Sequence, residues 1–175
     1  MQRVKEQPET LTQEEQERLL DAPSEKAPTG LRNKCILGLM LHNGLGINDI
    51  VGLKVGDIDW EKGVLKSWEE EVNLRDRALS LLKSWLKILD AEESDYLFRT
   101  LKGGKINGRY VREMLRRESQ AAGITKTVNP KVIYETYKQN RLKTTPEGKN
   151  RVENDGGRQS TSDSEREKPP GRLEL

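Results

Sequence analysis

The chain has 175 residues, of which 34% are charged and 33% hydrophobic, so it is more polar than an average globular domain. Its length allows one domain of ordinary size and a tail. The net charge of +2 argues against a protein that binds nucleic acid through bulk charge alone, although a local basic face is compatible with it. Without a signal-peptide pattern or an apolar run long enough to cross a bilayer, the sequence predicts a cytoplasmic location.

A capping box predicts where the first helix begins. The Thr12 hydroxyl can accept a backbone N–H of the first turn, while the Glu15 carboxylate can reach back to the N–H of Thr12. We expect this helix to run to about Ala22, with Leu19 and Leu20 facing inward.

Residues 31–41 are the most apolar stretch of the chain. They hold too many apolar side chains for one narrow stripe, which predicts a helix covered on most sides. Asn43 and Gly44 should end it, because a glycine just past the last apolar position can adopt the left-handed conformation that closes a helix. Residues 47–53 predict a second, short helix.

A hairpin is predicted to follow. Residues 55–60 are expected to be extended, and a turn at 61–63 brings the chain back as a strand at 64–66. The next stretch, residues 67–77, alternates weakly and carries three consecutive glutamates, so a third strand is only weakly indicated there.

The second half of the chain is helical in pattern. Leucines at helical spacing predict a helix over residues 79–89, with Trp85 in the core. A further helix is predicted over 108–122, and Pro130 should begin a last helix that ends near Leu142. The predicted fold class is therefore mainly α with a small antiparallel β-hairpin or sheet, an α+β arrangement.

Composition divides the chain into three parts. We expect residues 1–10 to be flexible, residues 11–142 to form the folded domain, and residues 143–175 to be a disordered polar tail. The tail is rich in Gly, Ser, Pro and both signs of charge, and it cannot bury enough surface to offset the entropy lost on ordering.

Four segments in the same order resemble the catalytic domain of the tyrosine recombinases, the phage-integrase family. They are residues 11–15, the pair Gly44 and Leu45, residues 53–59 and residues 121–124. The resemblance spans residues 11–137 and implies a family catalytic domain that is incomplete, because its last motifs have no match here. The helical DNA-clamping domain that precedes this point in the family is also expected to be absent.

The resemblance also implies a chemistry. Tyrosine recombinases break DNA by attack of a tyrosine hydroxyl on a phosphodiester, and they need no metal or other cofactor. Fixed cations must then meet the charge that develops on the phosphoryl oxygens. The family uses two arginines, a lysine in the hairpin and two histidine-type residues, and the planar fork of arginine suits it to hold two phosphate oxygens.

The matching positions of this chain hold other residues. The first arginine would follow Leu45, where the chain has Gly46, and the hairpin lysine falls on Glu70 or Glu71. In the second box, Lys131 stands where some branches of the family have lysine, and Tyr134 replaces the arginine. No match is found for the later Leu-Gly-His box or for the nucleophilic tyrosine.

These replacements predict that no catalytic residue remains. Losing one phosphate-clamping arginine costs on the order of three to five decades in rate. We expect Tyr134 and Tyr137 to pack in the core rather than to act as nucleophiles, and we expect Gly46, Glu70 and Tyr134 to line one shared pocket. The single His42 and the single Cys35 cannot supply a zinc site, and Cys35 should be a buried, inert thiol.

The helix predicted over residues 108–122 has the best case for binding DNA. Together with the segment before it, this helix carries Lys102, Lys105, Arg109, Arg112, Arg116 and Arg117. The resemblance places this region near the DNA backbone, and we predict that the contacts come from Lys105, Arg109, Arg112, Arg116 and Lys131. The alternative is a solvated basic face whose charges are balanced by Glu113 and Glu118.

Three functional hypotheses follow. The first is an integrase-like protein of DNA integration and site-specific recombination, for instance from a decaying mobile element, that is catalytically inactive and retains weak, backbone-directed affinity for double-stranded DNA. The second is an interaction module that regulates or poisons an intact recombinase. The third is an active integrase whose catalytic residues lie elsewhere in the sequence.

Overall fold

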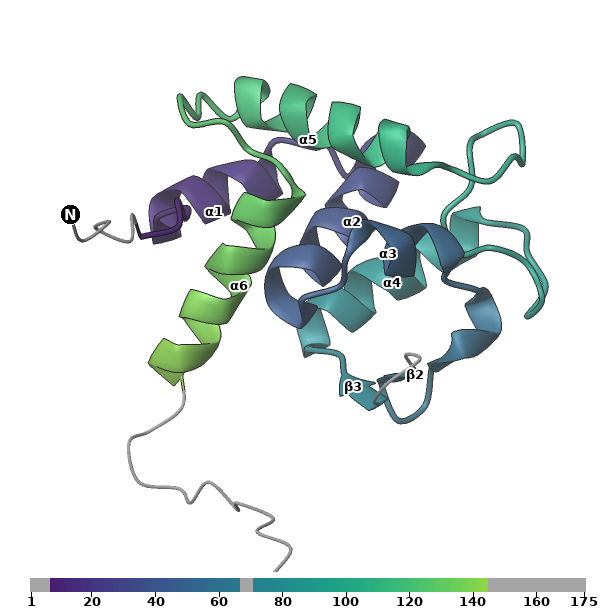
Figure 1. Ribbon diagram of the computed structural model, residues 1–175. Helices are drawn as coiled ribbons and strands as arrows, with labels where there is room; N and C mark the ends of the chain where they lie inside the picture. Colours follow the sequence, from purple (N-terminus) through teal and green to yellow (C-terminus); the bar gives the residue numbers. More distant parts are fainter. Residues whose placement is uncertain (1–6, 67–70, 145–175) are drawn as a thin grey trace, which may run out of the picture. The chain divides into compact units, whose positions relative to one another are not determined.

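The computed structural model describes residues 7–66 and 71–144. Helix α2, Pro28–Asn43, occupies the centre, with α1, α4 and α6 packed against it (Figure 1). Every residue of α2 from Gly30 to Leu41 is buried, which confirms the prediction of a helix covered on most sides. Gly44 ends it with a φ of 71°, in the left-handed conformation that the sequence predicts.

Helix α1, Gln13–Asp21, begins with the predicted capping box. The Glu15 N–H donates to the Thr12 hydroxyl at 3.2 Å, and the Thr12 N–H donates to Glu15 Oε2 at 2.8 Å. Leu19 is fully buried, and Leu20 packs half-buried against the core, so both face inward as predicted.

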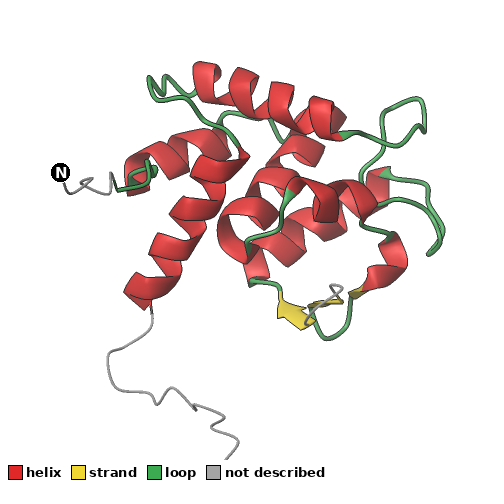
Figure 2. Cartoon of the chain, in the orientation of Figure 1, coloured by secondary structure: helices red, strands yellow, loops and turns green. Residues whose placement is uncertain are grey.

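The strands form one antiparallel sheet in the order β1-β2-β3, at the lower edge of the view in Figure 2. The strands are β1, Ile58–Asp59, β2, Val64–Lys66, and β3, Glu71–Asn73. Leu65 of β2 lies opposite both Ile58 and Val72. The weakly indicated third strand therefore exists, paired to β2 over its whole length.

The prediction of an extended segment over residues 55–60 is wrong in its first half. After helix α3, Ile47–Gly52, the chain makes a 3₁₀ turn, η1, at Val55–Asp57. The Asp57 carboxylate accepts the Lys54 N–H at 2.8 Å, and the N–H of Gly56 donates to the Glu93 carbonyl at 2.9 Å. These bonds satisfy the backbone outside the hairpin, so this segment does not continue the strand ladder.

Helices α4, Asp76–Ile88, α5, Gly108–Ala121, and α6, Pro130–Thr144, complete the domain. Trp85 of α4 is 2% exposed and donates its indole N–H to the Leu97 carbonyl at 2.8 Å, which confirms its place in the core. Helix α5 packs on α1 and α3. The mainly helical fold with a small antiparallel sheet confirms the predicted class. Within the described ranges no helix is long and apolar enough to span a membrane.

The predicted tail falls almost entirely outside the description. Helix α6 continues to Thr144, two residues beyond its expected end, and residues 145–175 are not described. The division at residues 10 and 142 therefore stays a prediction.

Candidate nucleic-acid interface

Gly46 stands at the start of α3 without needing to be a glycine. Its φ is −81°, and its N–H donates to Asp49 Oδ2 at 2.8 Å. A Cβ added there would meet only Asp49 Oδ2, at 3.4 Å, which is an ordinary contact. The backbone and the surrounding space would accept a longer side chain, so the glycine simply leaves the position open.

Gly44, two residues earlier, is constrained by packing. An added Cβ would stand 2.3 Å from Cε1 of Tyr137, because the ring of this α6 residue lies directly against the glycine. This contact docks α6 beside the turn that carries Gly46.

The expectation that Tyr134 packs in the core is wrong. Tyr134 is 48% exposed, because α6 turns Val132, Ile133 and Thr136 toward the interior. Its ring centroid lies 6.1 Å from that of Tyr137, at a tilt of 34°. Tyr137 is half-buried, so the prediction of a packing role holds for this second tyrosine.

A hollow of about 350 Å³ lies beside the hairpin. Its floor includes Leu45, Leu53 and Leu65, and its rim carries Lys54 and Lys66 together with the carboxylates of Asp49 and Asp57. The described lining includes neither Gly46 nor Tyr134, and Glu70 falls outside the described residues. The shared pocket expected for these three positions therefore stays a prediction. Glu71 begins β3, exposed and opposite Lys66.

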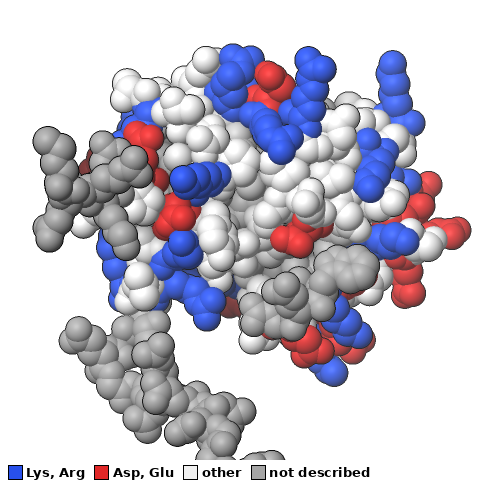
Figure 3. Space-filling view, in the orientation of Figure 1, with Lys and Arg blue, Asp and Glu red and all other residues white. Residues whose placement is uncertain are grey.

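The basic side chains of α5 fall into two groups. Arg116 pairs with Glu113 at 3.1 Å and Arg117 pairs with Glu118 at 3.2 Å, as the alternative of a solvated face predicts. Arg109 and Arg112 are exposed and form no ion pair with another described residue. Lysine and arginine side chains gather over α5 and over the turn before it (Figure 3). Within the described part of the chain, these two arginines are thus available to an anionic partner.

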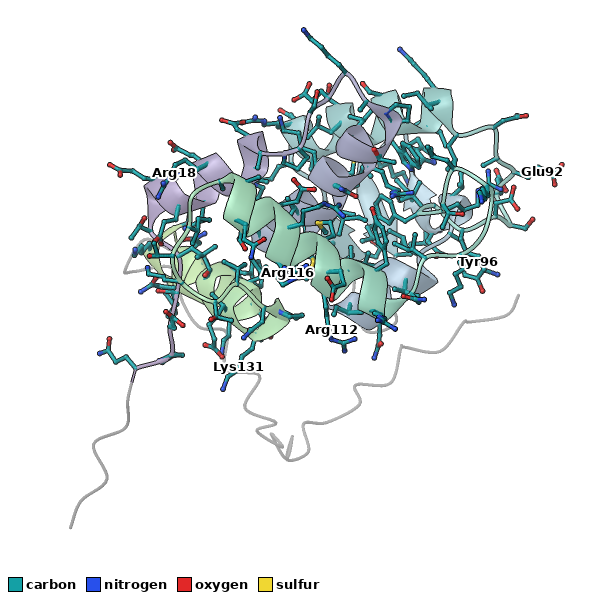
Figure 4. The ribbon with its side chains drawn as sticks, turned by 90° about the horizontal axis from the view of Figure 1, so that it is seen from above. Arg18, Glu92, Tyr96, Arg112, Arg116 and Lys131 are labelled. Atoms are coloured by element: carbon teal, nitrogen blue, oxygen red, sulfur yellow. The ribbon has the colours of Figure 1, made fainter. Side chains whose placement is uncertain are left out.

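The two lysines among the predicted contacts, Lys105 and Lys131, lie outside α5. Lys105, in the turn that precedes α5, holds its ammonium 4.5 Å from the centre of the Tyr96 ring. Lys131 is exposed in the first turn of α6. Figure 4 shows Arg112 and Lys131 directed toward the same side of the molecule. Of the predicted contacts, Arg116 is already paired with Glu113, and a shared DNA-binding surface of the others stays a prediction.

A buried arginine fastens α5 to the core, and no sequence pattern indicated it. Arg32 of α2 is 3% exposed and donates to the Arg99 carbonyl at 2.6 Å and to the Tyr110 hydroxyl. That hydroxyl donates to Asn33 Oδ1 at 2.8 Å, and Asn33 Nδ2 donates to Glu118 at 3.1 Å. The position of Arg32 next to the apolar stretch could have suggested a buried charge, and a buried arginine needs hydrogen-bond partners.

His42 and Cys35, the single histidine and the single cysteine of the sequence, are both at least half-buried. Burial, followed by Arg75 and Arg77, lowers the pKa of His42, so its imidazole is neutral near pH 7. Burial raises the pKa of Cys35 to about 12, which confirms an inert thiol. Across residues 7–66 and 71–144, no three His, Cys, Asp or Glu side chains come together so that they could hold a metal ion.

Comparison with known sequences specifies the family of this mainly helical domain with its small antiparallel sheet. Residues 9–135 match the phage integrase family, so the chain belongs to that family. It is 27% identical over 140 residues to the tyrosine recombinase XerD of Pseudomonas aeruginosa, and 28% identical over 144 residues to XerC of Thermodesulfovibrio yellowstonii.

These alignments cover 74% of this chain and 47% and 48% of the two relatives, so the chain spans about half the length of the curated relatives it matches. Among solved structures, XerA recombinase superposes with a TM-score of 0.68 at 24% identity, covering 77% of this chain and 51% of that one. The pre-cleavage complex of XerH with its difH substrate gives 0.63 at 23%, covering 78% and 43%. These superpositions establish the fold.

Proposed function

We propose that this chain is a recombinase-like domain that binds double-stranded DNA through its phosphate backbone and does not cleave it. Membership of the phage integrase family, together with the exposed Arg109 and Arg112 of α5, supports the binding. A solved structural neighbour, the XerH site-specific recombinase, is bound to its difH substrate. Arg109, Arg112 and Lys131 would touch phosphates, and Arg116 would contribute only if it left Glu113.

The absence of catalysis is supported by the residues at the matching positions. Gly46 offers no cation, and the exposed Tyr134 offers a phenol where a guanidinium would clamp the phosphate. Without a metal, fixed donors have to stabilise the transition state, and each such arginine is worth on the order of three to five decades in rate. Lys131 alone cannot make up that loss.

A salt titration of DNA binding tests the proposal. Fluorescence anisotropy with a short labelled duplex should give a log Kd that rises linearly with log salt, with little dependence on sequence. Replacing Arg109 and Arg112 by Gln should reduce the slope by about 0.9 for each phosphate that the protein no longer neutralises. Replacing Lys83 and Lys87, both exposed on α4, by Gln changes the net charge equally and is the matched control. No binding in low salt would refute the proposal.

A nicked suicide duplex tests the catalytic half. We expect no covalent protein–DNA adduct on a denaturing gel after long incubation. An adduct would show that the chain retains a nucleophile and that the third hypothesis, an active integrase, is right.

One observation favours the second hypothesis, an interaction module. Tyr134 and Leu142 lie eight residues apart on α6, which places them on one face, and they are 48% and 78% exposed. These two exposed apolar side chains, with Lys138 between them, suit contact with a protein partner such as an intact recombinase. Copurification with a recombinase that is lost on changing both residues to Ser, while DNA binding persists, would favour this role.

A further inference from the structure

Two lysine ammonium groups lie close to the ring of Tyr96, which is outside α5. The Lys105 ammonium lies 4.5 Å and the Lys54 ammonium 5.8 Å from the ring centroid. Both distances are within the range in which a cation is attracted by the negative face of an aromatic ring. Lys54 is distant in the sequence from Tyr96 and Lys105, so folding has to bring it to the ring.

Backbone pairing sets these positions. Lys54 and Tyr96 form an isolated antiparallel bridge, and Lys105 forms another with Arg99. The N–H of Leu97 donates to the Leu53 carbonyl at 2.8 Å, next to the first bridge. The two lysine stems therefore leave from fixed points beside the ring.

Neither lysine has an acidic partner within the described part of the chain. Two carboxylates close to them in the sequence are engaged elsewhere: Asp57 accepts the backbone N–H of Lys54, and Asp95 pairs with Arg99 at 3.6 Å. Two unpaired ammonium ions close to one ring raise the local positive potential, which attracts an anion. The cluster therefore carries two positive charges that no described carboxylate pairs with.

We propose that Lys54, Tyr96 and Lys105 form a second contact for the DNA phosphate backbone, beyond the contact made by α5. This inference rests on the proposed function. Lys105 lies three residues before α5, and the Arg112 guanidinium folds back so that its Nη1 lies 3.1 Å from where a Cβ of Gly108 would stand. In Figure 4, Tyr96 lies to the right of α5 and Arg112 at its lower edge.

An acidic edge bounds this basic surface, which leaves one path for a DNA duplex. Glu92 points away from Tyr96 in Figure 4, and acidic side chains gather at that edge in Figure 3. A polyanion would follow the cations from α5 to Lys54 and turn away from this edge. A surface that is open and continuous with α5 suits a chain of phosphates better than one free phosphate ion.

The test compares two double variants with equal loss of charge. Lys54→Gln with Lys105→Gln should lower the salt slope of duplex binding by about 2 and weaken binding on the order of tenfold near 0.1 M salt. Lys83→Gln with Lys87→Gln, both exposed on α4, should leave the slope unchanged. Circular dichroism and urea unfolding check that each variant folds like the parent.

A second pair of variants tests the ring. Tyr96→Leu removes the surface that holds the ammonium ions in place and should weaken binding roughly twofold or more. Tyr96→Phe keeps the ring and should bind like the parent. Inorganic phosphate at matched ionic strength should compete no better than chloride, and specific competition would instead indicate a site for a small anion and overturn the proposal.

The two proposals fail in different ways. If the parent protein binds duplex DNA and the Lys54 and Lys105 variant keeps the parental slope, the second contact is refuted and the proposed function stands. If the parent shows no binding in low salt, both are refuted.

Discussion

Replacing Gly44 by Ala should destabilise the domain through two effects of similar size. A Cβ at a φ of 71° costs about 1–2 kcal/mol, since the left-handed region is unfavourable for residues other than glycine. The new methyl group would also stand 2.3 Å from Tyr137 Cε1, so the ring has to move, at a cost of about 1–3 kcal/mol typical of overpacking. We therefore expect a loss of about 2–5 kcal/mol in the free energy of unfolding.

Urea unfolding followed by tryptophan fluorescence measures this loss, because Trp85 is buried in the core. Gly46→Ala is the matched control: its φ is −81° and its space is open, so the gain in chain stiffness and the loss of a glycine N-cap should nearly cancel, within about 1 kcal/mol.

A double-mutant cycle separates the two effects. In a Tyr137→Ala background the clash is gone, so Gly44→Ala should cost only the left-handed conformation, about 1–2 kcal/mol. An equal cost with and without the ring would refute the contact between α6 and the turn. No cost in either background would refute the conformation of Gly44.

Three further predictions concern single side chains. Gly46→Arg should fold with an unfolding free energy within about 0.5 kcal/mol of the parent and steepen the salt slope of DNA binding by about 0.9, and failure to fold would contradict the open space seen there. Cys35, with a pKa raised to about 12 by burial, should react with a thiol reagent at pH 8 only after unfolding in urea, and equal rates in both states would contradict its burial. Burial raises the pKa of Glu15, but hydrogen bonds from Lys126 and from the Thr12 N–H lower it overall, so its stabilising effect should be complete above its ordinary value and fade as pH falls through the lowered one. Lys126→Met should therefore flatten the acid side of the stability curve, and an unchanged curve would show that this pair contributes nothing.

Features that depend on adjacent residues could be predicted from the sequence. The capping box of α1 involves residues three apart, and the closing glycine of α2 follows its helix directly. The turn at residues 55–57 could not be predicted, because its backbone partners are Glu93 and Asp95, nearly forty residues later. From the sequence alone, residues 55–60 are compatible with a strand, because these distant backbone partners are not visible in it.

The candidate site shows the same division. The basic character of α5 follows from the sequence, but which of its arginines are already paired depends on rotamers and neighbours that only the folded chain defines. Tyr134 and Tyr137 both lie at helical spacing, and it is the contact of Tyr137 with Gly44 that decides which one is covered. The lysines on Tyr96 come from separate segments, so no local pattern indicates them.

Arg32 ties together the two halves of the proposed DNA-binding surface from below. One end of its guanidinium holds the carbonyl of Arg99, in the segment that carries the Tyr96 cluster, and the other holds Tyr110 of α5. A single guanidinium thus sets the spacing between these two segments. Changing Arg32 should loosen both of them without removing any side chain that a phosphate could reach.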